Sequence, residues 1–313
     1  MEDYPRTLGE MEARFSSEGA CRDYLFGLRW PDGFRCPRCR HDQAWPVGRT
    51  LYQCRRCAYK ASVTAGTIFE GTRKPLVAWF RAVWLVTSQK TGASALGIQR
   101  VLGLGSYKTA WVWLQKLRRA MVRPGRERLS GRVEVDESYL GGPEEGTRGR
   151  GTRNKALIAV AAEEDGKGIG RIRMRRIPSA AARELHAFVK DTVEPGSTIH
   201  TDGWNSYQGL EQEGYQHEVT PLKDGKGSAV LPRVHQAVSL LKRWLMGTHQ
   251  GAVSHEHLDY YLDEFVFRFN RRTSRHRGKL FYRLLQNAVR AEPAPYSSLV
   301  RGVPGRGKQR HKG

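Results

Sequence analysis

The chain has 313 residues, of which 53 are Lys or Arg and 31 are Asp or Glu, so its formal net charge is +22. This length allows about two domains, and the charge favours a polyanionic partner. Arg81 interrupts the longest apolar stretch, LVAWFRAVWLV, which argues against a membrane-spanning helix. Because the beginning, MEDYPRT, lacks a secretory hydrophobic region, we expect a cytoplasmic nucleic-acid-binding protein.

Residues 1–33 are expected to form an N-terminal helical segment, with a short helix from about Ser17 to Leu28. Cys21 falls within that helix. A lone cysteine in such a position usually behaves as a small buried hydrophobe, and we expect that role for Cys21.

The other four cysteines form two C-x2-C pairs, CPRC and CRRC, separated by 14 residues: Cys36, Cys39, Cys54 and Cys57. In a reducing compartment this spacing indicates a metal site rather than disulfides, with chance pairing as the alternative. Four thiolates suit the tetrahedral coordination of Zn²⁺. We therefore predict a zinc ribbon over residues 34–62 with a structural Zn²⁺, without which the segment would unfold. Its interleaved arginines form either a DNA-facing surface or a solvated charged face.

Residues 74–123 are predicted to contain a helix-turn-helix. Apolar residues recur at helical spacing over about 76–89, 94–101 and 106–121, and Gly103 and Gly105 mark a short turn. Lys108, Lys116, Arg118 and Arg119 lie largely off the apolar stripe of the last helix, which favours contact with DNA. The alternative is a helical hairpin that binds nothing. The tryptophans are expected to lie in the core.

Beyond Arg123-Pro124-Gly125, the pattern changes to strands. Strands are predicted over about 131–139, 156–162, 170–177, 197–202 and 217–220. Helices are predicted over about 180–190, 204–210, 232–247, 255–270 and 279–290, with a Gly/Arg loop at 143–155 and a basic tail at 293–313. This element order is that of an α/β ribonuclease-H-like domain with a mixed five-stranded sheet, which we place at 130–292.

Two acidic residues follow from that arrangement. Asp136 lies on the first strand and Asp202 lies at the tip of the fourth, so the fold would make them neighbours. A carboxylate at the edge of a buried strand is costly without a counter-charge, which divalent cations would supply. Paired carboxylates can bridge two such ions for phosphodiester chemistry. A single Asp is more often a paired surface residue, and Glu134 and Glu137 are possible substitutes.

The chain resembles the DDE-class insertion-sequence transposases of the ISXO type, which carry an N-terminal zinc ribbon. The matching stretches cover most of residues 20–290: CRDYLFGLRWPDGFRCPRCR, YQCRRC, VEVDESYLGG, HTDGWNSY, SLLKRWLMGTH and HLDYYLDEFVFRFNRR. The resemblance makes Asp136 and Asp202 the first two acidic positions. Where relatives usually have a third acid, this chain has His235, seven residues before Lys242. The resemblance therefore implies a DDH variant, with both side chains on one helix face.

The implied activity is DNA transposition: binding of terminal inverted repeats, two-metal nicking with Mg²⁺ or Mn²⁺, and joining of 3′-hydroxyl ends to target DNA. Imidazole favours Mn²⁺ over Mg²⁺. A homodimer or larger synaptic assembly in the bacterial nucleoid is implied as well. The expected phosphate contacts come from Arg148, Arg150, Arg153 and segment 268–277. The alternatives are a domesticated or inactive DNA-binding regulator and a nuclease that cuts without joining.

Overall fold

The computed structural model describes residues 2–123, 125–141, 155–221, 230–251 and 253–301. Arg148, Arg150, Arg153, most of the predicted Gly/Arg loop and residues 302–313 of the predicted tail lie outside these ranges. The chain divides into two compact units. We call residues 1–123 with 273–301 the N-terminal unit, and residues 124–272 the sheet unit.

Seven helices are described in the N-terminal unit: α1 (Leu8–Arg14), α2 (Glu18–Arg29), α3 (Leu76–Ser88), α4 (Ala95–Val101), α5 (Tyr107–Ala120), α10 (Gly278–Ala288) and α11 (Tyr296–Val300). The assignment of α10 corrects the predicted boundary at residue 292. Phe281 of α10 is buried, with its ring centroid 5.7 Å from those of Phe80 and Trp84. The apolar face of α10 therefore completes the aromatic core around α3 rather than the sheet.

The predicted turn between two helices joins α4 and α5, and Gly103 has a positive φ of 61° there. Arg118 differs from its predicted place off the apolar stripe, because it is only 1% exposed. The cause is that α4, α10 and α11 all pack against α5. Trp79 and Trp113 are core residues as predicted, with stacked rings 4.0 Å apart. What α5 exposes is its first turn, including Lys108, and contact with DNA there stays a prediction.

Residues 34–62 fold around a three-stranded antiparallel sheet in the order β1 (Ala44–Val47), β2 (Leu51–Cys54), β3 (Lys60–Ser62). The preceding helix α2 starts where predicted, because the side chain of Ser17 accepts a hydrogen bond from the backbone N–H of Ala20. Cys21 of α2 is fully buried, as expected, and burial raises the pKa of its thiol to about 12.

The described part of the sheet unit has five strands: β4 (Arg132–Leu140), β5 (Ala156–Asp165), β6 (Gly168–Ile177), β7 (Thr198–Thr201) and β8 (Gln216–Val219). Their order is β6-β5-β4-β7-β8. The pairs β4–β5 and β5–β6 are antiparallel, whereas β4–β7 and β7–β8 are parallel. This is the ribonuclease-H-like sheet predicted from the sequence. The central strand β5 is buried along most of its length, as its apolar sequence predicts.

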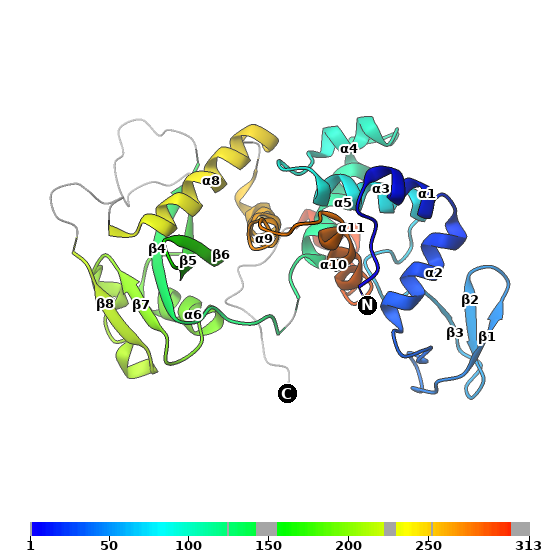
Figure 1. The fold of residues 1–313 in the computed structure, drawn as a ribbon, viewed down its shortest axis with the longest axis horizontal. Coiled ribbons are helices and arrows are strands. Elements are labelled where there is room, and N and C mark those ends of the chain that lie inside the picture. The colour runs from blue at the N-terminus through cyan, green and yellow to red at the C-terminus, as the bar shows by residue number, and fades with distance from the viewer. Residues whose placement is uncertain (1, 124, 142–154, 222–229, 252, 302–313) are drawn as a thin grey trace. The chain divides into compact units, whose positions relative to one another are not determined.

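Helices lie on both sides of this sheet (Figure 1). Helix α6 (Ala182–Thr192) buries Leu185, Phe188 and Val189 in one core with Val133 and Val135 of β4. Helix α8 (Pro232–His249) contacts β4, β5 and β6, and α9 (Leu258–Phe269) contacts β6. The predicted helix at 204–210 is replaced by two 3₁₀ turns, Asn205–Tyr207 and Glu211–Glu213. Gly209, with φ of 91°, separates them.

Within the described ranges, the structure has no helix that is long and apolar enough to cross a membrane.

Candidate catalytic and metal sites

The four predicted zinc ligands converge in the ribbon. The Sγ atoms of Cys36 and Cys57 are 3.6 Å apart, those of Cys39 and Cys54 are 3.5 Å apart, and all four lie within 4.8 Å of one another. Zn–S bonds of about 2.3 Å in a tetrahedron require sulfur atoms separated by about 3.8 Å. The donor set and its spacing therefore fit a structural Zn²⁺.

Two backbone turns hold these cysteines. Arg40 and Ala58 each follow the second cysteine of a pair and have positive φ angles of 64° and 55°. The N–H of Arg40 donates to the carbonyl of Cys36, and the N–H of Ala58 donates to that of Cys54. Burial alone would raise the pKa of Cys54, but backbone N–H donors from Cys57 and Arg56 lower it to about 6, which favours the thiolate that Zn²⁺ binds.

The second candidate site lies on β4 and just beyond the end of β7. The parallel register of these strands pairs Val133 with Ile199 and Glu134 with His200. Asp136 lies two residues beyond the last paired residue of β4, and Asp202 directly follows β7. Both carboxylates also help to raise the pKa of the Tyr207 phenol, after its burial and the charge of Glu137. Both residues therefore follow the paired part of β4 and β7, and their joint binding of a metal stays a prediction.

Strand alternation places Asp136 on the face that α8 covers. Val133 and Val135 point into the α6-side core, so Glu134 and Asp136 point to the opposite side. There the Nε2 atom of His235 on α8 lies 3.9 Å from the Oδ2 atom of Asp136. The side chain of Asp136 is 16% exposed and that of His235 is 40% exposed. Asp136 and His235 therefore form a partly open carboxylate–imidazole pair. Both groups are donors for divalent cations, and Asp202 as the further ligand stays a prediction.

The two possible substitutes for Asp136 are engaged elsewhere. Glu137 points to the α6 side, where it accepts a hydrogen bond of 2.9 Å from the hydroxyl of the buried Tyr207. Glu134 lies on the α8 side but is fully buried. Its Oε2 atom accepts hydrogen bonds from the backbone N–H groups of Arg233 and Val234, at 2.7 and 2.9 Å. These are donors of the first turn of α8, so Glu134 caps that helix from a neighbouring strand.

Glu134 also belongs to a group whose ligand atoms lie within 4.8 Å of one another, together with Glu164 and His200. The spacing alone would suit a cation. The guanidinium of Arg233 already occupies it, however, with Nη1 2.8 Å from Oε1 of Glu134 and 3.1 Å from Oε1 of Glu164. Arg132 binds Glu164 as well. The two carboxylates are therefore neutralised by arginine, and we interpret this cluster as a structural ion-pair network.

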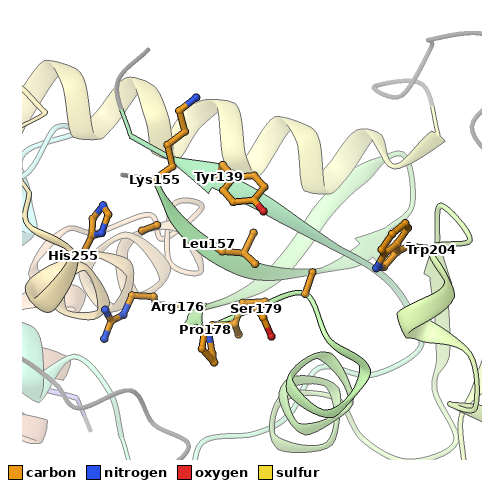
Figure 2. A pocket seen from close by; sticks show the side chains of 11 residues that line it. Tyr139, Lys155, Leu157, Arg176, Pro178, Ser179, Trp204 and His255 are labelled. Carbon is orange, nitrogen blue, oxygen red and sulfur yellow. The ribbon is translucent and has the colours of Figure 1, made fainter. Parts of the chain in front are cut away.

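Lys242 lies on the exposed side of α8, about two turns beyond His235. Desolvation and the nearby charge of Lys155 both lower the pKa of Lys242. Lys155 directly precedes β5 and lies against Gly141, just past the end of β4, and it lines a cavity of about 580 Å³ (Figure 2).

The predicted phosphate contacts from segment 268–277 are changed by the structure. The guanidinium of Arg271 lies over the ring of Phe267 and donates to its carbonyl oxygen. That of Arg272 lies over Phe269 and donates to the carbonyls of Ile169 and Gly170. Arg272 therefore joins the end of α9 to β6, whereas these contacts of Arg271 stay within α9. Phosphate contacts from the rest of the segment stay a prediction.

Two residues that contact the candidate site, Tyr207 and Arg233, were not predicted from the sequence. The role of Glu134 in capping α8 was not predicted either. Tyr207 stands in the stretch HTDGWNSY, five residues after Asp202, so its place in a shared motif was an available signal. Nothing in the local pattern around Arg233 or Glu134 indicates that the two meet, because they are separated by 98 residues of chain.

Two family models match separate parts of this chain. Residues 128–270 match the family described as an ISXO2-like transposase domain, and residues 16–60 match the transposase zinc-ribbon domain. A Halobacterium salinarum protein, described as an uncharacterized protein in transposable element ISH50, is 31% identical over 277 residues. The alignment covers 81% of this chain and 91% of that protein.

Solved structures give a much weaker likeness. A pre-cleavage Mos1 transpososome is 13% identical, with 69% of this chain and 79% of that chain covered and a TM-score of 0.27. A Mos1 strand transfer complex is 11% identical, with 62% and 75% covered and a TM-score of 0.21. The fold assignment rests on the strand order, and the family on the sequence matches: this chain belongs to the ISXO2-like insertion-sequence transposases with an N-terminal zinc ribbon.

Proposed function

We propose that this transposase works as a DDH variant of the DDE class, nicking DNA at the ends of its element and joining the 3′-hydroxyl ends to target DNA. The observation that carries the proposal is the convergence of three residues distant in sequence. It is supported by the positions of Asp136, two residues beyond the last β4–β7 pair, and of Asp202, directly after β7, and by the 3.9 Å between His235 and Asp136.

Each residue has a role set by its place. Asp136 and Asp202 would bind the catalytic ions jointly, and His235 would supply the third ligand. Two bound Mg²⁺ or Mn²⁺ ions would activate the attacking water or 3′-hydroxyl and stabilise the leaving oxygen. Lys242, on the same helix as His235, would bind a phosphate next to the scissile one.

DNA binding is assigned to the zinc ribbon and to the exposed first turn of α5, which would hold the terminal inverted repeats. The net charge of +22 supports this assignment, and binding should weaken steeply with salt. We expect a homodimer or larger assembly to bring two DNA ends together, which light scattering of the DNA complex would test.

The decisive experiment measures nicking and joining on DNA that carries the inverted repeats flanking the gene. Asp136→Asn and Asp202→Asn should each lower the nicking rate by about 10³-fold or more while leaving DNA binding intact. Asp165→Asn is the matched control, because Asp165 is an exposed carboxylate that ends β5, a strand that carries neither Asp136 nor Asp202. Wild-type protein that binds the ends without nicking them would instead be a DNA-binding regulator, and nicking without joining would identify a nuclease.

A further inference from the structure

The three-stranded sheet of the zinc ribbon, β1 to β3 in Figure 1, has one face packed against the chain and one open face. On the packed face, the ring centroid of Tyr52 lies 4.8 Å from that of Phe26 on α2 and 6.0 Å from that of Trp30, which directly follows α2. Ala61 pairs with Tyr52 across the sheet and is only 1% exposed. This face therefore belongs to an aromatic core shared with α2.

Strand alternation places a different set of residues on the open face. The register pairs Trp45 with Gln53 and Gln53 with Lys60. Gln53 directly follows Tyr52 on β2, so this row points away from the packed face. Trp45 is 48% exposed, and Lys60 is exposed as well. Because neighbouring strands lie about 4.8 Å apart, the row crosses the sheet over about 10 Å, from an aromatic ring to an ammonium group.

The surroundings of this row are cationic. Every Lys and Arg among residues 34–62 is exposed, and Asp42 is the only acidic residue in that segment. The guanidinium of Arg55 lies over the ring of Trp45, 5.3 Å from its centroid. The charge of the ribbon therefore complements a polyanion, and it places a phosphate-binding group directly beside the exposed ring.

The position of Trp45 indicates which form of DNA suits this face. In a duplex the faces of the bases are covered by stacking, so an indole ring on a protein surface can stack only on an unpaired base. The major groove admits an α-helix or a two-stranded ribbon, whereas this face is three strands wide. A single strand can lie across an open sheet, with its bases on aromatic rings and its phosphates near cations.

We propose that the open face of the ribbon sheet binds single-stranded DNA, with a base stacked on Trp45 and phosphates bound by Arg55 and Lys60. The amide of Gln53, between Trp45 and Lys60, can donate to or accept from the edge of a base. The inference rests on the DNA-binding role proposed for the ribbon and deepens it, because it names the form of DNA that the ribbon binds. Nicking at the ends of the element would supply such strands.

The test measures the fluorescence anisotropy of two labelled DNAs with the full-length, zinc-loaded protein and no added divalent metal. One is an oligothymidine of about 12 nucleotides, within the range of about 4–16 nucleotides that OB-fold modules cover, and the other is a blunt duplex of the terminal repeat. Trp45→Ala should weaken binding of the oligothymidine by about 5- to 100-fold and leave binding of the duplex unchanged. Trp45→Phe, which keeps an aromatic face, is the matched control and should retain most of the affinity.

Lys60 provides an independent variant. Lys60→Gln should reduce the slope of log affinity against log salt concentration for the oligothymidine by about 0.7, the value for one phosphate contact on a single strand. Arg73→Gln is the matched control, because Arg73 is an exposed cation outside the ribbon, and it should leave the slope unchanged. Zinc content and melting temperature show whether each variant keeps a folded ribbon. If Trp45→Ala loses zinc, the salt slope of Lys60→Gln decides.

A photochemical readout reports the stacking directly. With 5-iodouracil in place of one thymine, irradiation should cross-link the strand of the wild-type complex to Trp45, which peptide mass spectrometry would identify. Unchanged affinity of Trp45→Ala for the oligothymidine, or an equal loss of affinity for both DNAs, would overturn this assignment and leave the proposed function standing. Failure of wild type to bind either DNA would overturn both.

Discussion

Two polar clusters lie close together in the sheet unit, and they differ in what neutralises their charge. The inner cluster combines Glu134 of β4, Glu164 of β5 and His200 of β7 with Arg233 of α8. The proposed outer cluster combines Asp136, Asp202 and His235, each two residues beyond a member of the inner cluster. In the inner cluster the counter-charge is an arginine of the chain itself, 2.8 Å from the carboxylate.

The carboxylates of the two clusters differ in their exposure to solvent and in the groups that lie next to them. Glu134 is fully buried and accepts three hydrogen bonds from Arg233 and Val234. Asp136 is partly exposed and faces an imidazole at 3.9 Å, a group that can ligate a metal when neutral. Acidic residues two positions apart on one strand can therefore differ in role: Glu134 fastens a helix, whereas Asp136 lies partly exposed beside His235.

The largest expected contrast is between stability and activity in two alanine variants. Glu134→Ala should lower the free energy of unfolding by about 3–5 kcal/mol, because it removes a fully buried carboxylate that accepts hydrogen bonds from the first turn of α8 and from the Arg233 guanidinium. Asp136→Ala should change that free energy by less than about 1 kcal/mol while abolishing nicking. Urea denaturation and the nicking assay would measure the two effects.

A control distinguishes charge from packing at the inner cluster. Glu134→Gln keeps the shape of the side chain and an oxygen acceptor for the first turn of α8, so its destabilisation should be smaller than that of Glu134→Ala. Equal losses of stability in the Glu134 and Asp136 variants would mean that the two clusters are not distinct in the way described.

The next contrast concerns Lys242, which lies on the same helix as both clusters. Lys242→Met should reduce nicking by about 10- to 100-fold through loss of a phosphate contact, and Lys242→Arg should restore most of it. Arg243→Gln is the matched control, because Arg243 is the adjacent exposed cation. A similar loss in Arg243→Gln would indicate a general effect of positive charge.

The zinc ligands could be predicted from the sequence because they are local. Cys36 to Cys57 span 22 residues, and C-x2-C spacing alone places two thiolates on one turn. The strand order was also within reach, because apolar alternation over β4 and the continuous apolar run of β5 are properties of short segments. In these cases the physical cause acts over a few residues.

Other features depend on contacts that no local pattern encodes. The apolar face of α10 predicts burial but not the partner, which is the aromatic core around Phe80. In VEVDES, Glu134, Asp136 and Glu137 are equivalent by composition, and only the faces of β4 and the position of α8 separate them. Arg118 looked exposed because its burial arises from helices far along the chain.

A smaller effect is expected from exchanging the third ligand of the outer cluster. Wild type should nick faster with Mn²⁺ than with Mg²⁺, and His235→Glu should raise the ratio of Mg²⁺- to Mn²⁺-supported rates by about tenfold, because a carboxylate suits the harder ion. His235→Asn tests whether any neutral side chain gives the same ratio. Equal ratios in wild type and His235→Glu would remove His235 from the metal site.

The smallest expected effect is on the pH dependence of stability and concerns Glu163. Like Glu134, it is a buried carboxylate paired with an arginine. Burial alone would raise its pKa, but hydrogen bonds from Arg171 and from the N–H of Ser130 lower it below the ordinary value of 4.5. A lowered pKa in the folded state means that this group stabilises the fold above about pH 4.5 and that the contribution is lost as the pH falls through the folded pKa.

Melting temperatures of wild type and Glu163→Gln should therefore differ at pH 7 and converge toward pH 3. Asp165→Asn, which changes an exposed carboxylate of the same strand, should show no such convergence. A difference between wild type and Glu163→Gln that persists unchanged at pH 3 would mean that the arginine pairing does not depend on the carboxylate charge. It would also contradict the claim that the charge of Glu134 stabilises its pairing with Arg233, which is the feature that separates the inner cluster from the outer one.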